Sequence, residues 1–148
     1  MGEIKAVEDL VKSTKPIYMV NLVKYRETAQ YQDSDPQEFK DLPKISGKEC
    51  MYTRYLSGCA AVVTVDMPKF FASAICGDVG DSDKKNGEWD EIAIMEFQSI
   101  QHFREFIGNE EYLKSARPHR KAAAEKQLRL ASFVEFDSRV HKEEDLRV

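Results

Sequence analysis

The stretch E-W-D-E-I-A-I-M-E-F at residues 88–97 decides the fold, because its apolar, β-branched and aromatic residues predict a strand late in the chain. This predicted strand starts next to Trp89, the single tryptophan of the sequence. The segment 17–24, I-Y-M-V-N-L-V-K, is apolar almost throughout and predicts a strand buried on both faces. Two further strands are predicted, at 69–76 after Pro68 and at 128–136, where apolar residues alternate.

The segments between these strands carry apolar residues at helical spacing. Ser46 has the pattern of an N-cap, with Glu49 three residues on, and the helix that follows presents Tyr52 and Tyr55 on one side. Ser99 is predicted to cap a short helix at 100–107, and a further helix covers 110–126. An extra N-terminal helix is expected at 3–13. Residues 27–43 read as an excursion with short helical turns, and 77–87 as a hairpin-like turn.

The resulting order is β-α-β-β-α-β after one extra helix. It predicts an α+β domain of the ferredoxin-like type, with a four-stranded antiparallel sheet and helices on one face. We expect one domain over 1–148, with its core at 16–136 and a charged C-terminal tail at 137–148. The strands are apolar on both sides and the helices cover one, so we expect a homodimer that closes two sheets into a barrel.

Composition excludes several classes of partner. The 148 residues hold 26 acidic and 22 basic side chains, which makes nucleic acid and anionic membranes poor partners. No window approaches the roughly 18 apolar residues of a membrane span, and no secretory signal is recognised at the start. Three separated cysteines predict buried free thiols rather than a disulfide framework, and hence a cytoplasmic protein.

His119 and Arg120 are the predicted catalytic pair. They follow Pro118 near a helix start, where the positive helix end lowers the pKa of an imidazole and favours its proton-accepting form. The guanidinium of Arg120 offers a rigid fork of donors to a carboxylate or an enolate oxygen. The alternatives are a histidine satisfied within an interface and a salt bridge from Arg120 to an acid such as Asp90.

A second group of residues is predicted to contact a substrate: Asn21, Tyr52, Tyr55, Trp89, Asp90 and Tyr112. Asn21 is the polar residue of an apolar strand, so its amide either orients a ligand or pins a loop. Core packing with hydroxyls at a cavity rim explains Tyr52 and Tyr55 as well as substrate contact does. Trp89 and Asp90 point to opposite faces of their strand, and the tryptophan also fits a core or dimer anchor.

Four segments together resemble the domain of unknown function 1330 family: P-I-Y-M-V-N-L-V-K-Y at 16–25, S-G-K-E-C-M-Y-T-R-Y at 46–55, E-W-D-E-I-A-I-M-E-F at 88–97 and N-E-E-Y-L-K-S-A-R-P-H-R-K-A-A at 109–123. The resemblance spans 16–136 and implies the dimeric α+β barrel superfamily, with a cavity between sheet and helices. That superfamily includes cofactor-free monooxygenases, lactone isomerases, polyketide cyclases, haem-dependent enzymes and proteins without known catalysis, so it implies no single reaction.

Other motifs are missing from the sequence. The three histidines lack metal-ligand spacing, and no nucleotide-binding glycine motif or G-x-S-x-G elbow occurs, so no metal and no cofactor are predicted. Two function classes remain. The favoured one is a cofactor-free isomerase, cyclase or monooxygenase acting on a small carbonyl-bearing or aromatic metabolite. In it His119 moves a proton, and Arg120, Asn21 or a tyrosine hydroxyl stabilises the oxyanion. The alternative is a non-catalytic small-molecule-binding or stress-related dimer.

Overall fold

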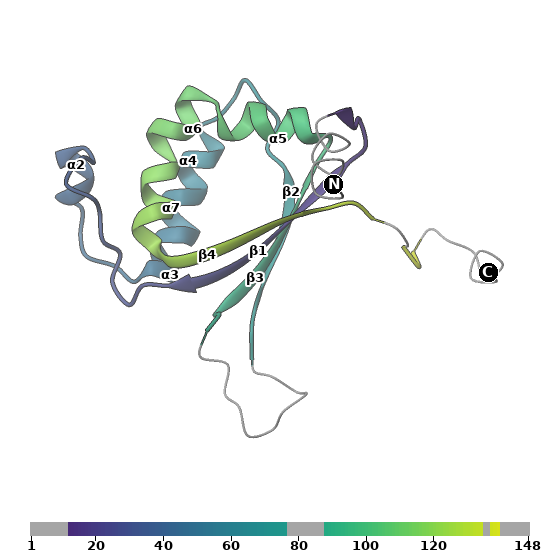
Figure 1. Cartoon of the computed structure of the whole chain (residues 1–148). Helices are drawn as coiled ribbons and strands as arrows, with labels where there is room; N and C mark the ends of the chain where they lie inside the picture. The colour runs from purple at the N-terminus through teal and green to yellow at the C-terminus, as the bar shows by residue number, and fades with distance from the viewer. Residues whose placement is uncertain (1–11, 77–87, 135–136, 140–148) are drawn as a thin grey trace, which may run out of the picture.

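Four strands form one antiparallel sheet in the computed structural model, which describes residues 12–76, 88–134 and 137–139 (Figure 1). The strands are β1 (Ile17–Tyr25), β2 (Lys69–Ala74), β3 (Glu91–Phe97) and β4 (Ala124–Ser132). They lie side by side in the order β2-β3-β1-β4, and every neighbouring pair is antiparallel. Helices join β1 to β2 and β3 to β4. The predicted ferredoxin-like βαββαβ fold is therefore confirmed.

The first helical connection is continuous through α3 (Gly47–Cys50), one π-helical turn η1 (Met51–Tyr55) and α4 (Leu56–Ala60). Its start is the predicted one, because the Ser46 hydroxyl accepts a hydrogen bond from the Glu49 amide at 3.1 Å. A short helix, α2 (Gln37–Lys40), lies in the excursion before it. In Figure 1, α4 stands over one face of the sheet, while α2 projects to the side.

The second connection contains α5 (Ile100–Ile107), α6 (Glu110–Ser115) and α7 (Arg117–Ala123). Ser99 caps α5 as predicted, and Pro118 lies in the first turn of α7, where its missing amide proton costs nothing. Figure 1 shows α6 and α7 beside α4 on the same face of the sheet, which we call the inner face. The core lies between this face and the helices.

The inner face has two different ends. Ile17, Met19 and Phe97 belong to an apolar core with Phe106 of α5 and Tyr112 of α6, and all five are at most 5% exposed. At the other end of β1 the inward positions continue as Asn21, Val23 and Tyr25. The core therefore closes one end of the space under the helices, and polar side chains lie on the inner face at the other end.

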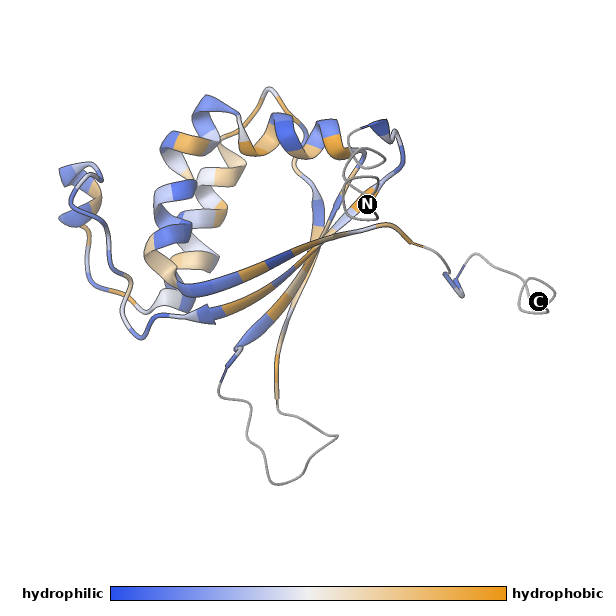
Figure 2. Ribbon diagram, viewed as in Figure 1, coloured by the Kyte–Doolittle hydropathy of each residue, from blue (hydrophilic) through white to orange (hydrophobic). Residues whose placement is uncertain are grey.

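The outer face of the sheet carries apolar cross-strand rows. The register places Phe71, Ile94, Val20 and Leu130 in one row across the four strands. Phe71 is 58% exposed and Leu130 50%. Figure 2 shows hydrophobic residues in orange along the strands. The outward side chains of 17–24 are half-buried in the single chain, whereas the inward ones are buried. Burial of the second face, expected for a dimer, stays a prediction.

Several strand boundaries differ from the prediction, and β4 also ends at Ser132 rather than at 136. β3 begins at Glu91 rather than at 88, and just before it the Asp90 side chain, in place of a backbone carbonyl, accepts a hydrogen bond from the Tyr25 amide at 2.8 Å. β2 ends at Ala74 rather than at 76. The last helix ends at Ala123, and β4 begins at once at Ala124, which pairs with Tyr25.

Some predictions lie outside the described residues, namely most of the helix at 3–13, the turn at 77–87 and most of the tail at 137–148. Cys50 and Cys59 are buried free thiols as predicted, whereas Cys76 is a free thiol that is exposed. Within the described ranges, no helix combines the length and apolarity needed to span a bilayer.

Candidate functional site

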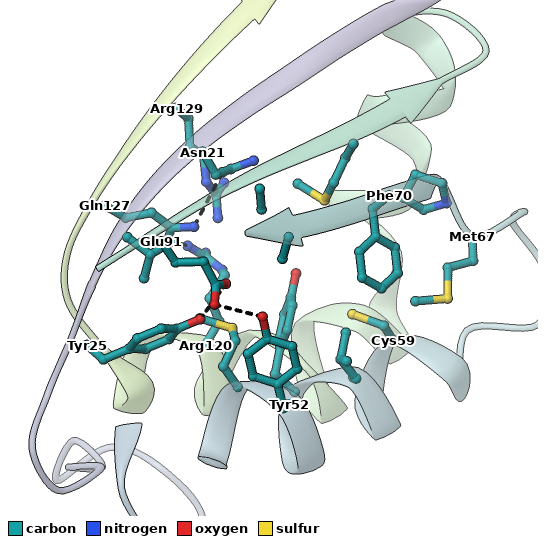
Figure 3. Close-up of a pocket in the computed structure, with 18 of the residues that line it drawn as sticks. Asn21, Tyr25, Tyr52, Cys59, Met67, Phe70, Glu91, Arg120, Gln127 and Arg129 are labelled. Atoms are coloured by element: carbon teal, nitrogen blue, oxygen red, sulfur yellow. Dashed lines mark hydrogen bonds between the residues drawn. The ribbon is translucent and has the colours of Figure 1, made fainter. Parts of the chain in front are cut away.

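A cavity of about 80 Å³ lies between the inner face of the sheet and the helical turns η1, α4 and α7 (Figure 3). One ordered water needs about 10–15 Å³ on this measure, so the cavity has room for about five to eight water-sized groups. Apolar side chains line the part near the edge strand: Leu56, Met67, Phe70, Ala72, Met95 and Phe106. This volume suits a compact organic molecule.

The strand register brings four polar side chains together on the cavity wall. Asn21 stands between Ala93 of β3 and Arg129 of β4. One step along the same face, Val23 stands between Glu91 and Gln127. We call the group Asn21, Glu91, Gln127 and Arg129 the polar patch. It occupies inward positions of a sheet whose other inward positions are mostly apolar.

Glu91 is the most enclosed charged residue of the polar patch. It is 4% exposed, and its two carboxylate oxygens accept hydrogen bonds from Tyr25 and Tyr52, each at 2.7 Å. Figure 3 shows the carboxylate pointing from the sheet towards Tyr52 on η1. Two hydroxyl donors fix the carboxylate in position, and each oxygen keeps a further lone pair that no other donor in the described part of the chain uses.

The hydroxyl and thiol groups around the cavity hold their protons at neutral pH. Burial, reinforced by the hydrogen bond to Glu91, raises the pKa of Tyr52 to about 12 and that of Tyr25 further above its ordinary value. Burial also raises the pKa of Tyr55 well above its ordinary value, and that of Cys59 to about 11. These groups act as donors, so Glu91 is the carboxylate proton acceptor on the described cavity wall.

Arg120 reaches the cavity from α7. Its Nη1 donates to Gln127 Oε1 at 2.9 Å, and Gln127 Nε2 donates to Asn21 Oδ1 at 3.4 Å. The Arg120 Nε atom is buried without a hydrogen bond partner. Burial, and then the neighbouring Arg120 charge, lower the pKa of the Arg129 guanidinium. The two arginines thus bring positive charge to the same side of the cavity.

The predicted site residues are only partly brought together. Asn21, Tyr52, Tyr55 and Arg120 all line the cavity, as a shared site requires. Tyr112 lies behind the wall, because its ring is buried in the core and its hydroxyl lies 3.1 Å from that of Tyr55. It contacts two residues of the cavity wall, Tyr55 and Arg129.

His119 lies elsewhere. It is 6% exposed, its Nδ1 lies 2.7 Å from the Tyr31 hydroxyl, and its ring centre lies 4.4 Å from that of Phe39. Burial and then the Arg54 charge lower the pKa of His119, whereas Asp35 raises it. The His119 ring therefore faces the segment 27–43, which contains Tyr31 and Phe39.

The expectation that His119 and Arg120 line one cavity is corrected for His119, which is not among the residues of the cavity wall. Consecutive residues on a helix point in different directions, so Arg120 reaches the sheet while His119 meets Tyr31 on another side of α7. A role for His119 in proton transfer stays a prediction.

Trp89 and Asp90 precede β3 and do not line the cavity. The Lys126 ammonium lies 5.0 Å from the centre of the Trp89 ring, a cation–π distance. Asp90 binds the Tyr25 amide, and Arg120 binds Gln127. The predicted alternative of an Arg120–Asp90 salt bridge is therefore not found among the described residues.

Four important cavity residues were missed from the sequence: Tyr25, Glu91, Gln127 and Arg129. A signal existed for Glu91, because it shares its strand parity with Ala93 and Met95 and therefore faces the same side. Gln127 and Arg129 alternate with Leu128 and face the opposite side from it. The sequence alone does not show which side of β4 faces the helices, because this depends on the strand register.

Metal binding has no support in the described ranges, which contain no group of three or more histidine, cysteine, aspartate or glutamate side chains placed to hold an ion. The donors around the cavity are mostly hydroxyl, amide and guanidinium groups. Such groups suit hydrogen bonding to an organic ligand better than coordination of a cation.

No family model matches this chain, and no curated protein matches it. Solved structures do match. The methylated RPA0582 protein is 24% identical, with 93% of this chain and 94% of the other covered at a TM-score of 0.66. A second structure, the RPA0582 protein of unknown function from Rhodopseudomonas palustris, is 23% identical, with 89% and 92% covered at a TM-score of 0.57.

An ethyl tert-butyl ether D family protein from Bacillus halodurans is 11% identical, with 80% of this chain and 98% of the other covered at a TM-score of 0.50. At these identities the likeness concerns the fold. The chain thus shares its arrangement of a four-stranded sheet and covering helices with proteins of solved structure.

Proposed function

We propose that the cavity binds a small carbonyl-bearing or aromatic metabolite and that the protein catalyses a cofactor-free proton transfer on it, of the isomerase or cyclase type. The observation that carries this proposal is the Glu91 carboxylate, 4% exposed on the cavity wall and fixed by two tyrosine hydroxyls at 2.7 Å. A base that removes a proton from carbon must be held close to its substrate and away from competing water.

The proposed step uses groups that all line the cavity. Glu91 takes a proton from the carbon next to a carbonyl group, and the electron pair of that bond moves onto the carbonyl oxygen. The Arg120 guanidinium stabilises the resulting oxyanion, since a positive donor placed beforehand favours developing charge. Return of the proton to another carbon gives an isomer. Attack of the enolate carbon on a second carbonyl of the same molecule forms a ring and an alkoxide, which takes up the proton held by Glu91.

The experiment follows exchange of carbon-bound hydrogen for deuterium by proton NMR. The probes are acetophenone, pyruvate and phenylpyruvate in deuterated buffer. Wild-type protein should accelerate loss of the α-proton signal of at least one probe, and Glu91→Gln should lose that acceleration by about 10² or more. Glu96→Gln is the matched control, because Glu96 is on the same strand, faces the other side and is also bound by a tyrosine hydroxyl.

The result separates the two function classes. Equal exchange rates in wild type and Glu91→Gln would refute the role of Glu91. Binding of the probes without any exchange would favour the alternative, a non-catalytic small-molecule-binding dimer. His119→Gln tests the predicted role of His119, because a selective loss of exchange in that variant would assign the proton transfer to the histidine instead.

We also propose that the protein is a homodimer that pairs the outer faces of two sheets. The apolar rows on that face include Phe71 at 58% and Leu130 at 50% exposure, and contiguous exposed apolar surface of this kind marks an interface. Light scattering should give twice the chain mass of 17.0 kDa. Leu130→Asp should shift it to the monomer, whereas Val63→Asp, 87% exposed and outside the sheet, should not. A wild-type monomer would refute the proposal.

Membership of the domain of unknown function 1330 family is a further part of the proposal. It is supported by the order of the four segments at 16–25, 46–55, 88–97 and 109–123 and by the βαββαβ topology into which they fold. The buried free thiols of Cys50 and Cys59 support a cytoplasmic location, since a reducing compartment preserves them.

A further inference from the structure

The charged groups around the cavity are not balanced. Arg120 and Arg129 supply two positive charges, and Glu91 supplies one negative charge. Within the described residues no ion pair joins either arginine to an acid, and the Glu91 oxygens accept hydrogen bonds from tyrosine hydroxyls. One positive charge therefore has no counterpart in the part of the chain that the structure describes.

The Arg120 guanidinium also has unused donors. Arg120 has five N–H donors, of which Nη1 binds Gln127 and Nε is buried without a partner. A buried donor left unpaired destabilises the protein, so an acceptor that satisfies it is favoured. Gln127 is held in turn by Asn21, which fixes one edge of the Arg120 group and leaves the remainder of the fork for another acceptor.

The positive charges of the two arginines also repel each other. The pKa of Arg129 is lowered first by burial and then by the Arg120 charge, which is the expected effect of a like charge nearby. An anion placed between them would offset both effects. A carboxylate suits this position, because its two oxygens match a planar guanidinium fork.

The rest of the cavity is apolar. Phe70, Met95 and Phe106 line it beyond the polar patch, and the volume of about 80 Å³ suits a compact body. We infer that the ligand of this cavity is a small monocarboxylate with an apolar or aromatic body, its carboxylate bound by Arg120 and Arg129. The inference deepens the proposed function, whose cavity it shares, by naming the charged group of the substrate.

The test compares acids with their uncharged amides by titration calorimetry on the full chain. The probes are benzoate with benzamide and phenylacetate with phenylacetamide. Each acid should bind at least about tenfold more tightly than its amide, the ratio that corresponds to 1.4 kcal/mol. Arg120→Gln and Arg129→Gln should each reduce this preference, while Arg104→Gln, an exposed arginine of α5 outside the cavity, should preserve it.

Lysine variants control for a loss of binding that is caused by misfolding. Arg120→Lys and Arg129→Lys keep the positive charge and should retain part of the preference for the acid, whereas a merely structural role would give no such rescue. The inference is overturned if the amides bind as tightly as the acids, if neither acid binds at millimolar concentration, or if the preference survives in both Gln variants.

These outcomes are distinct from those of the exchange experiment. Preferred binding of the acids without hydrogen exchange keeps the inference and refutes the proposed catalysis. Glu91-dependent exchange on acetophenone, together with equal binding of acids and amides, keeps the catalysis and refutes the inference.

Discussion

Gly58→Ala should destabilise the protein although alanine is the better helix former. Gly58 is buried in α4 where this helix meets the junction of α6 and α7. A Cβ atom at this position would lie 2.0 Å from the Ser115 carbonyl oxygen and 2.7 Å from the Ala116 Cα. Both contacts are with backbone atoms, so no change of rotamer relieves them. Ordinary van der Waals contact begins at 3.4 Å, so the helices would have to separate by at least about 1.4 Å.

The magnitude follows from two opposing effects. Overpacking against a fixed backbone costs about 1–3 kcal/mol or more, and replacing glycine by alanine within a helix returns about 0.5–1 kcal/mol. Because 2.0 Å is far inside contact distance, the clash belongs at the upper end of its range. We expect a net loss of about 2 kcal/mol, which lowers the melting temperature of a chain of this size by roughly 4–8 °C.

Urea denaturation followed by circular dichroism measures the effect. The control is Ser57→Ala, an exposed position on the same helix, which should change the unfolding free energy by less than about 0.5 kcal/mol. An unchanged or raised midpoint for Gly58→Ala would refute the close approach of the helices. Because η1 and α4 carry Tyr55 and Cys59 of the cavity wall, the variant should also weaken ligand binding.

Three further predictions test other contacts. Tyr25→Phe should lower the unfolding free energy by about 1.5–3 kcal/mol, since the Tyr25 hydroxyl binds the Glu91 carboxylate. Tyr52→Phe should lower it less, because Tyr52 is 41% exposed. A larger loss for Tyr52→Phe than for Tyr25→Phe in urea denaturation would contradict this prediction. His119→Gln should flatten the loss of stability as pH falls through about 6.5, because the folded protein favours the neutral imidazole and the unfolded chain takes up the proton; parallel curves of urea midpoint against pH would contradict it. Ser46→Ala removes the cap of α3 and should lower the unfolding free energy by about 1 kcal/mol, so an unchanged midpoint would exclude that contribution.

Much of the fold could be predicted from the sequence because local signals agreed with the tertiary structure. The apolar run of β1 and the caps at Ser46 and Ser99 all indicated elements that exist. The start of β4 was missed because Ala-Glu-Lys-Gln at 124–127 favours a helix. Pairing with Tyr25 and Lys24 of β1 overrides that preference.

The candidate site was harder to predict. Asn21 and Arg120 were found because a polar residue in an apolar context is conspicuous. Glu91, Gln127 and Arg129 were missed because a polar residue in an alternating strand ordinarily faces solvent. Only the register shows that the charged side of these strands faces the helices, since a shift by one residue would reverse both faces.

The inner face of the sheet combines two kinds of surface that stability alone would not put together. Near α5 it packs Ile17, Met19 and Phe97 into a dry core, as a stable fold requires. A few ångströms of strand further along, the same face carries Glu91 and Arg129, which have no ion-pair partner in the described ranges. Apolar residues of similar volume at such positions are often neutral or stabilising. The retention of charge under these helices is therefore better explained by binding and chemistry in the cavity than by the stability of the fold.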